Sequence, residues 1–405
     1  MKKLMLKSLA VLVAASTLVP FGGAVAKAAE TKDVTLTVWG PQEDQTGEKW
    51  LQKMGEKFNE MHPEWNIKFE YGVVPEADAK TNLATDAAAG ADVYMYANDQ
   101  LPDLLTANAI AELGGKTVEE IKANNSETTV KTVTYKDGVY GVPFTANTWF
   151  MYYDKRVFSE EDVKSLDKML EKGVVSFPLS NSWYIASFYA ANGNKIFGDG
   201  TDESAGIDWS GDKGTDVTKY LVDLVKNKNF RNDVDGAGIA GLADGSINAM
   251  FSGTWDYDNV VKALGKDNVG IAAAPSYTLN GEEKQLKAFA GSKAIGVNPN
   301  SKNPDVAVAF AAFLGSKEAQ QAHYDSRNII PTDTNIDVSE NPLAKAQADA
   351  MEFASVVQPL VPAMSNYWTP AQTLGERIVA GEVTHENAAE VTESTNKAMN
   401  SSAVE

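Results

Sequence analysis

The sequence predicts an α/β protein made of two lobes, and three observations support this fold class. Patterns typical of strands and helices alternate from residue 33 onward. A second series of such patterns begins near residue 140. The 405 residues are enough for two domains, yet no Pro- or Ser-rich linker separates them. We therefore expect two α/β lobes joined directly by crossings of the chain.

The first series has apolar residues that alternate in the strand segments and recur on one face in the helix segments. In chain order it comprises a strand ending at residue 39, a helix over 46–61, a strand over 67–71, a helix from residue 75 and a strand over 92–97. Strands that alternate with helices in this way predict a parallel, doubly wound sheet.

The second series contains short apolar strands between amphipathic helices. It comprises a strand over 148–154, helices over 159–172, 183–191 and 216–226, strands over 247–252, 269–273 and 293–297, and a hairpin at residues 280–281. The hairpin is expected because Asn280-Gly281 is a strong turn dipeptide. The remainder is expected to be mostly helical.

The N-terminus resembles a secretory signal peptide. Three lysines within residues 2–7 precede an apolar stretch over 8–23, and small residues at 24–28 suit cleavage. We assign 1–29 to the signal peptide. The chain has no cysteine, so this sequence offers no residue for lipid attachment. We expect an exported protein that is released, periplasmic or associated with the cell surface.

Charge narrows the choice of partner. The chain has a formal net charge of −19, and removing residues 1–29, which hold four lysines and no acid, changes it to −23. Such a surface repels nucleic acid and anionic lipid. The composition favours a neutral or cationic ligand.

Motifs for catalysis, metals and cofactors fail when their context is considered. Residues 236–241 match G-x-G-x-x-G, but the preceding segment is polar rather than a buried strand, which favours a loop entering a helix. A calcium loop at 233–236 would need acids where Arg231 and Leu242 stand. The three histidines lie far apart, so surface or packing roles are favoured. We expect no catalytic residue, no metal and no cofactor.

Aromatic residues at the ends of elements, beside small or polar residues, form the one pattern that indicates a ligand. The set comprises Tyr96, Trp149, Trp183, Trp255 and Trp368. Sugar rings need flat aromatic surfaces for their C–H faces and polar partners for their hydroxyls. For any one of these residues, core packing is favoured by about two to one. Their shared position at element ends, where open α/β sheets bind ligands, favours a site for the set.

The sequence resembles the extracellular solute-binding proteins of bacterial carbohydrate ABC importers, in particular the maltose/maltodextrin-binding group of Gram-positive bacteria. The resemblance is carried most specifically by residues 72–83, 92–105, 140–155, 244–255 and 364–368. It implies a periplasmic-binding-protein-like fold with a ligand cleft between the lobes and a hinge of several crossings. The implied lobes are 30–145 plus 293–320 and 146–288 plus 325–405. The crossings are expected near 145–147, 286–293 and 318–326.

The resemblance also implies binding residues. Asp99 matches an aspartate that accepts sugar hydroxyls, Trp255 and Trp368 match stacking aromatics, and Trp183 stands where the family has a tyrosine. Gln100 replaces an arginine and Asn147 a hinge glutamate. The complete predicted ligand-binding set is Glu43, Asp44, Tyr96, Asp99, Gln100, Asn147, Trp149, Trp183, Trp255, Tyr257 and Trp368.

The sequence thus favours a non-catalytic oligosaccharide receptor for maltose or maltodextrins, which delivers an α-glucan to a membrane permease. A receptor for xylo- or galacto-oligosaccharides is the nearest alternative, because stacking aromatics suit several glycans. A secreted glycoside hydrolase is the alternative from another class, since a pair of carboxylates could escape notice among 55 acids. A peptide or metal receptor of similar shape is disfavoured.

Overall fold

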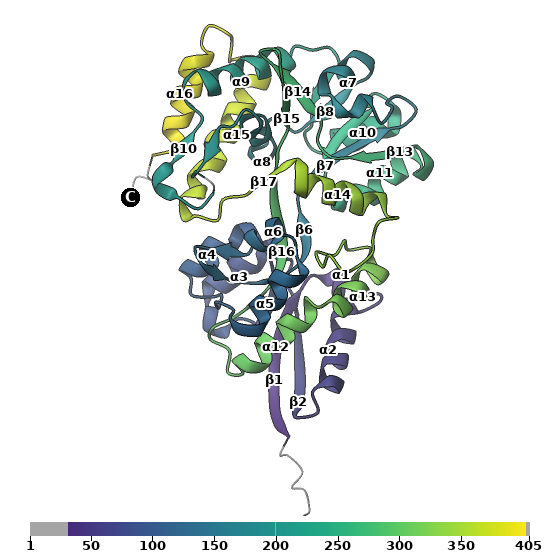
Figure 1. Ribbon diagram of the computed structural model, residues 1–405, viewed down its shortest axis with the longest axis vertical. Helices are drawn as coiled ribbons and strands as arrows, with labels where there is room; N and C mark the ends of the chain where they lie inside the picture. The colour runs from purple at the N-terminus through teal and green to yellow at the C-terminus, as the bar shows by residue number, and fades with distance from the viewer. Residues whose placement is uncertain (1–30, 199, 402–405) are drawn as a thin grey trace, which may run out of the picture.

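The computed structural model describes residues 31–198 and 200–401. The predicted signal peptide therefore lies outside the described residues. The chain forms two lobes stacked along the long axis of the molecule, with β1 at the far end of one lobe (Figure 1). Lobe 1 contains this N-terminal strand, and lobe 2 contains the C-terminal helices. No helix among the described residues is long and apolar enough to cross a membrane.

Lobe 1 is built on a six-stranded sheet of order β17-β16-β3-β1-β2, with β6 paired to β16. Its strands are β1 (Lys32–Gly40), β2 (Trp65–Val73), β3 (Val93–Ala97), β6 (Val142–Asn147), β16 (Ala288–Val297) and β17 (Ser355–Val357). The first three pair in parallel, as expected, but β16 runs antiparallel to both β3 and β6. The sheet is therefore mixed, because the chain returns from lobe 2 through β16 in the opposite direction.

Helices flank this sheet, and lobe 1 also contains a small separate hairpin. They are α1 (Gln42–Gln45), α2 (Trp50–Met61), α3 (Ala79–Thr85), α4 (Leu101–Thr106), α5 (Gly115–Asn124), α6 (Glu127–Lys131), α12 (Pro304–Leu314) and α13 (Lys317–Arg327), with the 3-10 turns η1 (Glu76–Asp78), η2 (Ala87–Ala89) and η3 (Asn98–Gln100) and the hairpin β4 (Thr134–Tyr135) and β5 (Gly138–Val139). The helix expected over 46–61 forms as α2. Its buried residues Trp50, Leu51, Met54 and Phe58 fall on one face.

Lobe 2 has a five-stranded mixed sheet of order β11-β8-β12-β7-β13. Its strands are β7 (Phe150–Asp154), β8 (Val175–Phe177), β11 (Phe230–Asn232), β12 (Ala249–Ser252) and β13 (Val269–Ala272), beside the two-stranded pairs β9 (Lys195–Ile196) with β10 (Ile207–Asp208) and β14 (Ser276–Leu279) with β15 (Glu282–Gln285). The hairpin expected at 280–281 joins β14 to β15, and both of its turn residues have positive φ. β11 corrects one expectation: a short strand does precede residues 236–241, which then enter α10 as a loop.

The helices of lobe 2 are α7 (Leu166–Lys172), α8 (Ser182–Ala191), α9 (Gly211–Leu224), α10 (Ala237–Asp244), α11 (Tyr257–Leu264), α14 (Pro342–Phe353), α15 (Ser365–Val379) and α16 (Ala388–Met399), with the 3-10 turns η4 (Asp162–Lys164), η5 (Glu203–Ala205), η6 (Thr254–Asp256), η7 (Lys266–Asn268) and η8 (Pro362–Met364). The helix expected over 159–172 is interrupted. Ser165 is extended and caps α7 by accepting a hydrogen bond from the Lys168 amide, so the segment divides into η4 and α7.

Three segments connect the lobes and contact one another. The first passes from β6 to β7, and the second is β16, whose N-terminal half belongs to the lobe 2 core and whose C-terminal half belongs to the lobe 1 core. The third corrects an expectation: residues 318–326 lie within α13, which packs on α2 of lobe 1, so this crossing follows at 328–341. Thr145 Oγ1 donates to the Ile330 carbonyl, and Thr148 Oγ1 donates to the Phe289 carbonyl. These bonds tie all three crossings together.

Candidate functional site

Lobe 1 presents a polar surface where β3 ends. Asp99 lies two residues beyond Ala97, in η3, and its side chain is exposed. The neighbouring Asn98 is buried, with its amide donating to the Thr132 carbonyl and its Oδ1 accepting from the Ser292 amide at 2.9 Å. Because Asn98 is fixed on both sides, the backbone directs Asp99 outward in a defined position.

The Asp99 carboxyl is exposed at the surface, but the groups packed around it remove part of its hydration. Partial removal from solvent raises its pKa above the ordinary aspartate value, and the positive charge of Lys80 opposes this rise. Lys80 itself pairs with Asp103, at 2.6 Å from Nζ to Oδ2. The Asp99 carboxylate can accept hydroxyl hydrogen bonds from a neutral ligand.

An ion pair that the sequence reasoning missed lies beside Asp99. Lys293 projects from β16, where it pairs with Ala97, and its Nζ lies 3.2 Å from Oε1 of Glu76 in η1. Lys293 is the one charged residue in β16, and a charged residue in a strand of mostly apolar residues could have indicated a binding role. The Glu76 backbone is fixed by Gln100, whose Nε2 donates to its carbonyl at 2.7 Å.

Lobe 2 presents an aromatic surface. The rings of Trp183 and Trp255 have centroids 6.1 Å apart and are tilted by 41°, and Trp255 is 51% exposed. The Trp183 indole donates to Oε1 of Gln358 at 3.0 Å, which fixes its ring. Trp368, at the start of α15, packs edge-on against Phe289 with centroids 6.2 Å apart. Gln358 is a second residue that the sequence reasoning missed.

Strand β16 carries a residue that contacts each of the two surfaces. Phe289, which contacts Trp368, and Lys293, which contacts Glu76, are four residues apart. Side chains separated by an even number of residues point to the same face of a strand. At a strand rise of about 3.3 Å per residue, these two positions are about 13 Å apart. A ligand of a few sugar rings could therefore contact the aromatic surface of lobe 2 and the polar surface of lobe 1 together.

Four predicted site residues are buried in this structure. Tyr96 donates its hydroxyl to the Tyr140 carbonyl, and Trp149 stacks on Tyr184 with centroids 5.2 Å apart. Gln100 accepts from the Lys80 amide through its Oε1. The four buried residues are Asp44, Tyr96, Gln100 and Trp149. All four are enclosed by neighbouring side chains, and none of them faces open space.

The remaining predicted residues are distributed differently. Glu43 is exposed on α1, and Asn147 is half-buried at the end of β6. Tyr257, at the start of α11, is half-buried and lines a cavity of about 700 Å³ within lobe 2 together with Tyr153 and Lys266. The structure thus places Asp99 at the surface of lobe 1, Trp183 beside Trp255 in lobe 2, and Trp368 against Phe289 in lobe 2.

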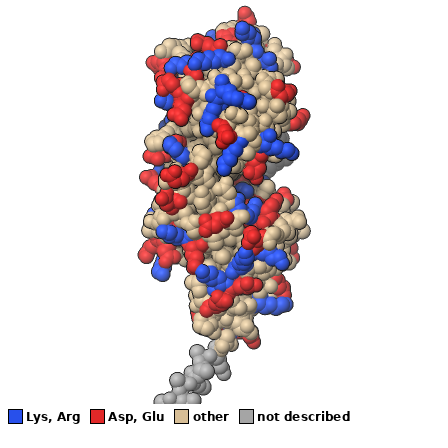
Figure 2. Space-filling view, turned by 90° about the vertical axis from the view of Figure 1, so that its right-hand side faces the viewer, with Lys and Arg blue, Asp and Glu red and all other residues tan. Residues whose placement is uncertain are grey.

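Charged groups cover the rest of the molecule in small, mixed clusters. On the face shown in Figure 2, acidic and basic side chains are interspersed over both lobes. Among the described residues, no group of three or more His, Cys, Asp or Glu side chains is arranged to hold a metal ion. His62 and His385 pair with exposed acids, while His323 is buried against Asp44.

Comparisons with known proteins agree with this geometry. Residues 53–351 match the family model described as bacterial extracellular solute-binding protein. The chain is 24% identical to the galactooligosaccharide-binding protein of Bacillus subtilis over 87% of its own length and 86% of the relative's. It is 27% identical to a maltooligosaccharide ABC transporter solute-binding lipoprotein of Streptococcus pneumoniae, over 78% and 81% of the two chains.

Two solved structures have the same fold over nearly their whole length. One, determined with acarbose, superposes with a TM-score of 0.83 at 53% identity, covering 90% of this chain and 98% of the other. The second is the maltodextrin-binding protein MalE1 of L. casei BL23 without ligand, with a TM-score of 0.84 at 26% identity over 91% and 99% of the chains. The two-lobed α/β fold expected from the sequence is confirmed.

Proposed function

Because the chain belongs to the family of bacterial extracellular solute-binding proteins, we propose that it is a non-catalytic receptor that binds maltose or maltodextrins and delivers them to the membrane permease of an ABC importer. The observation that supports the proposal is the pair of neighbouring rings Trp183 and Trp255 in lobe 2, together with Trp368 packed on Phe289 of β16, the strand that also carries Lys293 at the polar surface of lobe 1. An exported location, as the family name implies, suits this role.

Each surface supplies one half of what a sugar requires. The exposed ring of Trp255 and the neighbouring Trp183 offer flat faces for the C–H sides of the sugar rings. Asp99 and the Glu76–Lys293 pair offer acceptors and donors for the hydroxyls. Each hydroxyl buried without such a partner would weaken binding by about 1–3 kcal/mol. Binding is therefore strong only when both surfaces contact the ligand.

This requirement gives a mechanism for lobe closure. A sugar bound to one lobe gains the remaining contacts only when the other lobe approaches, so the ligand stabilises the closed arrangement through its differential affinity. The three hydrogen-bonded crossings, tied by Thr145 and Thr148, are the segments that can bend. The permease would then recognise the closed receptor.

A second candidate ligand is a galacto-oligosaccharide, because the relative from Bacillus subtilis binds that class. The same aromatic and polar surfaces could hold either glycan, since specificity depends on the orientation of individual hydroxyls. The acarbose found with the 53% identical structure and the maltodextrin relatives favour the α-glucan.

Isothermal titration calorimetry of the mature chain, residues 30–405, tests the proposal. Maltotriose, acarbose, xylotriose and a β-galactan trisaccharide are titrated in parallel, and the sugars are recovered and analysed afterwards. We expect micromolar binding of maltotriose and acarbose, with intact maltotriose recovered. Tight binding of the galactan alone would replace the ligand but keep the receptor function. Recovery of cleaved sugar would overturn the non-catalytic role.

A further inference from the structure

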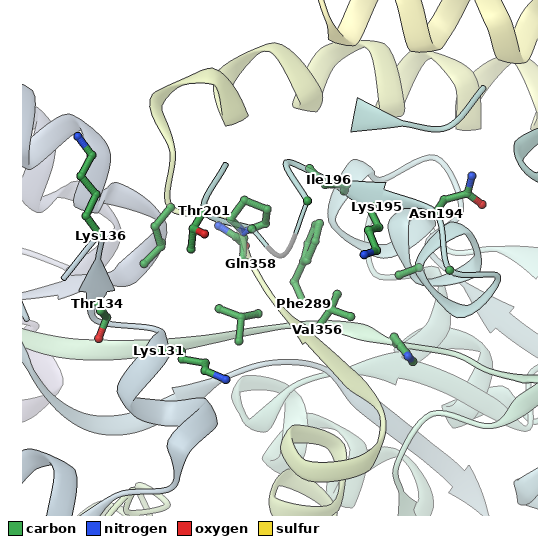
Figure 3. Close-up of a pocket in the computed structure, with 18 residues that line it drawn as sticks. Lys131, Thr134, Lys136, Asn194, Lys195, Ile196, Thr201, Phe289, Val356 and Gln358 are labelled. Carbon is green, nitrogen blue, oxygen red and sulfur yellow. The ribbon is translucent and has the colours of Figure 1, made fainter. Parts of the chain in front are cut away.

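Two cavities lie beside the crossings that connect the lobes. One, of about 570 Å³, is lined by Gly198 and Gly200, which adjoin the internal residue outside the described ranges (Figure 3). The other, of about 720 Å³, is lined by the fully described segments 126–129, 146, 330–338 and 344–352. None of the eleven predicted ligand-binding residues lines this second cavity, which we call the crossing cavity.

The walls of the crossing cavity come from both lobes and from two of the crossings. Lobe 1 contributes residues 126–129 at the start of α6, the first crossing contributes Ala146, and the third contributes residues 330–338. Lobe 2 contributes one face of α14, formed by residues 344, 347, 348 and 351 at helical spacing. The volume is within the range of about 300–1,000 Å³ typical of small-molecule sites.

Gln347 presents an unused amide to this cavity. The residue is 4% exposed, and its amide has no hydrogen-bond partner among the described residues. The amide atoms are not enclosed by protein, and the residue lines the cavity from the middle of the α14 face. Burying an amide without a partner is unfavourable, so a donor or acceptor in the cavity would be stabilised here.

Asp333 places a negative charge in the wall of the same cavity. It is 3% exposed, and its Oδ1 accepts from the backbone amide of Asn335 at 2.8 Å and from the Asn335 side chain at 2.9 Å. Its Oδ2 is enclosed and has no hydrogen-bond partner in the described part of the chain. A buried carboxylate without a counter-charge is costly, and a cation in the cavity would offset that cost.

The charges around the crossing cavity favour a cation. Its lining contains Glu127, Asp333 and Glu352, and no lysine, arginine or histidine among the described residues. Glu127 pairs with Lys131, and Figure 3 shows the Lys131 side chain at the wall of the other cavity. The whole chain has a net charge of −19, which also attracts cations.

The remaining walls are apolar and indicate the class of cation. Ala146, Ile330, Ile336, Val338 and Met351 line them. A bare inorganic cation would leave these walls in contact with water, whereas an organic cation with an apolar body would cover them.

We propose that the crossing cavity binds a primary organic amine with an apolar body. Its ammonium group donates to the oxygen of Gln347, and the charge of Asp333 balances it. The apolar body lies against the crossing and α14. This site is independent of the proposed sugar function, because it shares no residue with the predicted sugar contacts.

Calorimetry of the mature chain at pH 7, without sugar, tests the site. 2-Phenylethylamine, which is protonated at this pH, is titrated in parallel with 2-phenylethanol, a neutral probe with the same apolar body. We expect the amine to bind and the alcohol to bind at least about tenfold more weakly, because hydrogen bonds from charged groups are the stronger ones. Equal binding of the two probes, or no binding of the amine, would overturn the proposal.

Three variants locate the site. Asp333→Asn keeps an oxygen that can accept from Asn335 but removes the charge, and should weaken amine binding about tenfold. Gln347→Met has a similar length and breaks no hydrogen bond within the described protein, and should weaken binding about threefold. Glu340→Gln removes an exposed acid from the same crossing outside the lining, and should change binding less than twofold.

Thermal unfolding of each variant serves as the control for folding. Unchanged amine affinity in a folded Asp333→Asn or Gln347→Met variant would overturn the assigned site. An equal loss in the Glu340→Gln variant would indicate general charge attraction and would also overturn it. If Asp333→Asn does not fold, Gln347→Met and the comparison of the two probes decide the question.

Discussion

The Nε2 atom of His323 lies 2.7 Å from Oδ1 of Asp44, and both side chains are almost fully buried. Arg327 contacts the same carboxylate oxygen, and the Trp50 ring stacks on the imidazole with centroids 3.9 Å apart. Asp44 belongs to α1, the short helix directly after β1, while the histidine and the arginine belong to α13, and His323 is 279 residues later in the chain. The cluster therefore attaches α1 to the last helix before the third crossing.

Asp44→Asn should destabilise the protein, because the substitution removes the negative charge that Arg327 and His323 contact inside the protein. Breaking such a pair costs about 3–5 kcal/mol, and we expect a loss near the lower end because Arg327 is partly exposed. Urea unfolding at pH 7 measures the change. Asp267→Asn, at an exposed site on η7, is the matched control and should change the free energy of unfolding by less than about 0.5 kcal/mol.

The same cluster gives a pH dependence with a defined sign. Burial alone would raise the pKa of Asp44, but the hydrogen bonds and charges of His323 and Arg327 outweigh it and hold the pKa below the ordinary value of 3.8. The contribution of Asp44 to stability is therefore complete above 3.8 and is lost as the pH falls from there towards its folded pKa. The gap between wild type and Asp44→Asn should narrow below pH 3.8. A constant gap down to pH 2 would contradict this explanation.

Trp255→Ala should weaken maltotriose binding by about 1–3 kcal/mol, which is roughly 5- to 150-fold. The wild-type ring is 51% exposed, so its removal should leave the free energy of unfolding within about 1 kcal/mol. Trp368→Ala should weaken binding similarly but also lose some stability, because that ring packs on Phe289. Phe353→Ala, with a 65% exposed ring on α14, is the control. Normal sugar affinity in either tryptophan variant would overturn the assigned surface.

Trp149 should behave differently from these tryptophans. It is fully buried against Tyr184, Phe177 and Phe251. Trp149→Ala should lower the free energy of unfolding by about 3–5 kcal/mol. Trp149→Phe keeps an aromatic ring in the core, so it should lose less stability and retain maltotriose affinity within about twofold. If Trp149→Phe were stable but bound sugar tenfold more weakly, the binding surface would have to extend to this position.

The contrast between Trp149 and Trp255 shows how far local sequence can predict the site. Both stand at the end of an element beside small or polar residues, and that pattern fits a stacking surface and a core position equally well. Burial of Trp149, which lies between β6 and β7, depends on packing against Tyr184 from α8, and no local pattern contains this contact. Trp183 and Trp255, in contrast, do lie side by side, with ring centroids 6.1 Å apart, and their role in sugar binding stays a prediction.

Long-range pairing accounts for most of what could not be predicted. Glu76 and Lys293 are 217 residues apart, and their ion pair exists only because β16 returns beside β3. The same return makes the sheet mixed rather than parallel. Periodicity succeeded where a helix buries one face, as in α2, and failed at Ser165, whose capping side chain divides one expected helix into two elements.

Asp99 predicts a pH dependence of sugar binding. Reduced hydration raises the pKa of the Asp99 carboxyl above the ordinary aspartate value, and the positive charge of Lys80 opposes part of this rise. The carboxylate accepts sugar hydroxyls, whereas the protonated acid loses part of that capacity. Maltotriose affinity should therefore fall as the pH decreases, and the fall should begin at a higher pH than an ordinary aspartate would give. Asp99→Asn should bind more weakly at pH 7 and lose this dependence, as calorimetry from pH 7 to pH 4 would show. An unchanged profile in Asp99→Asn would remove Asp99 from the sugar site.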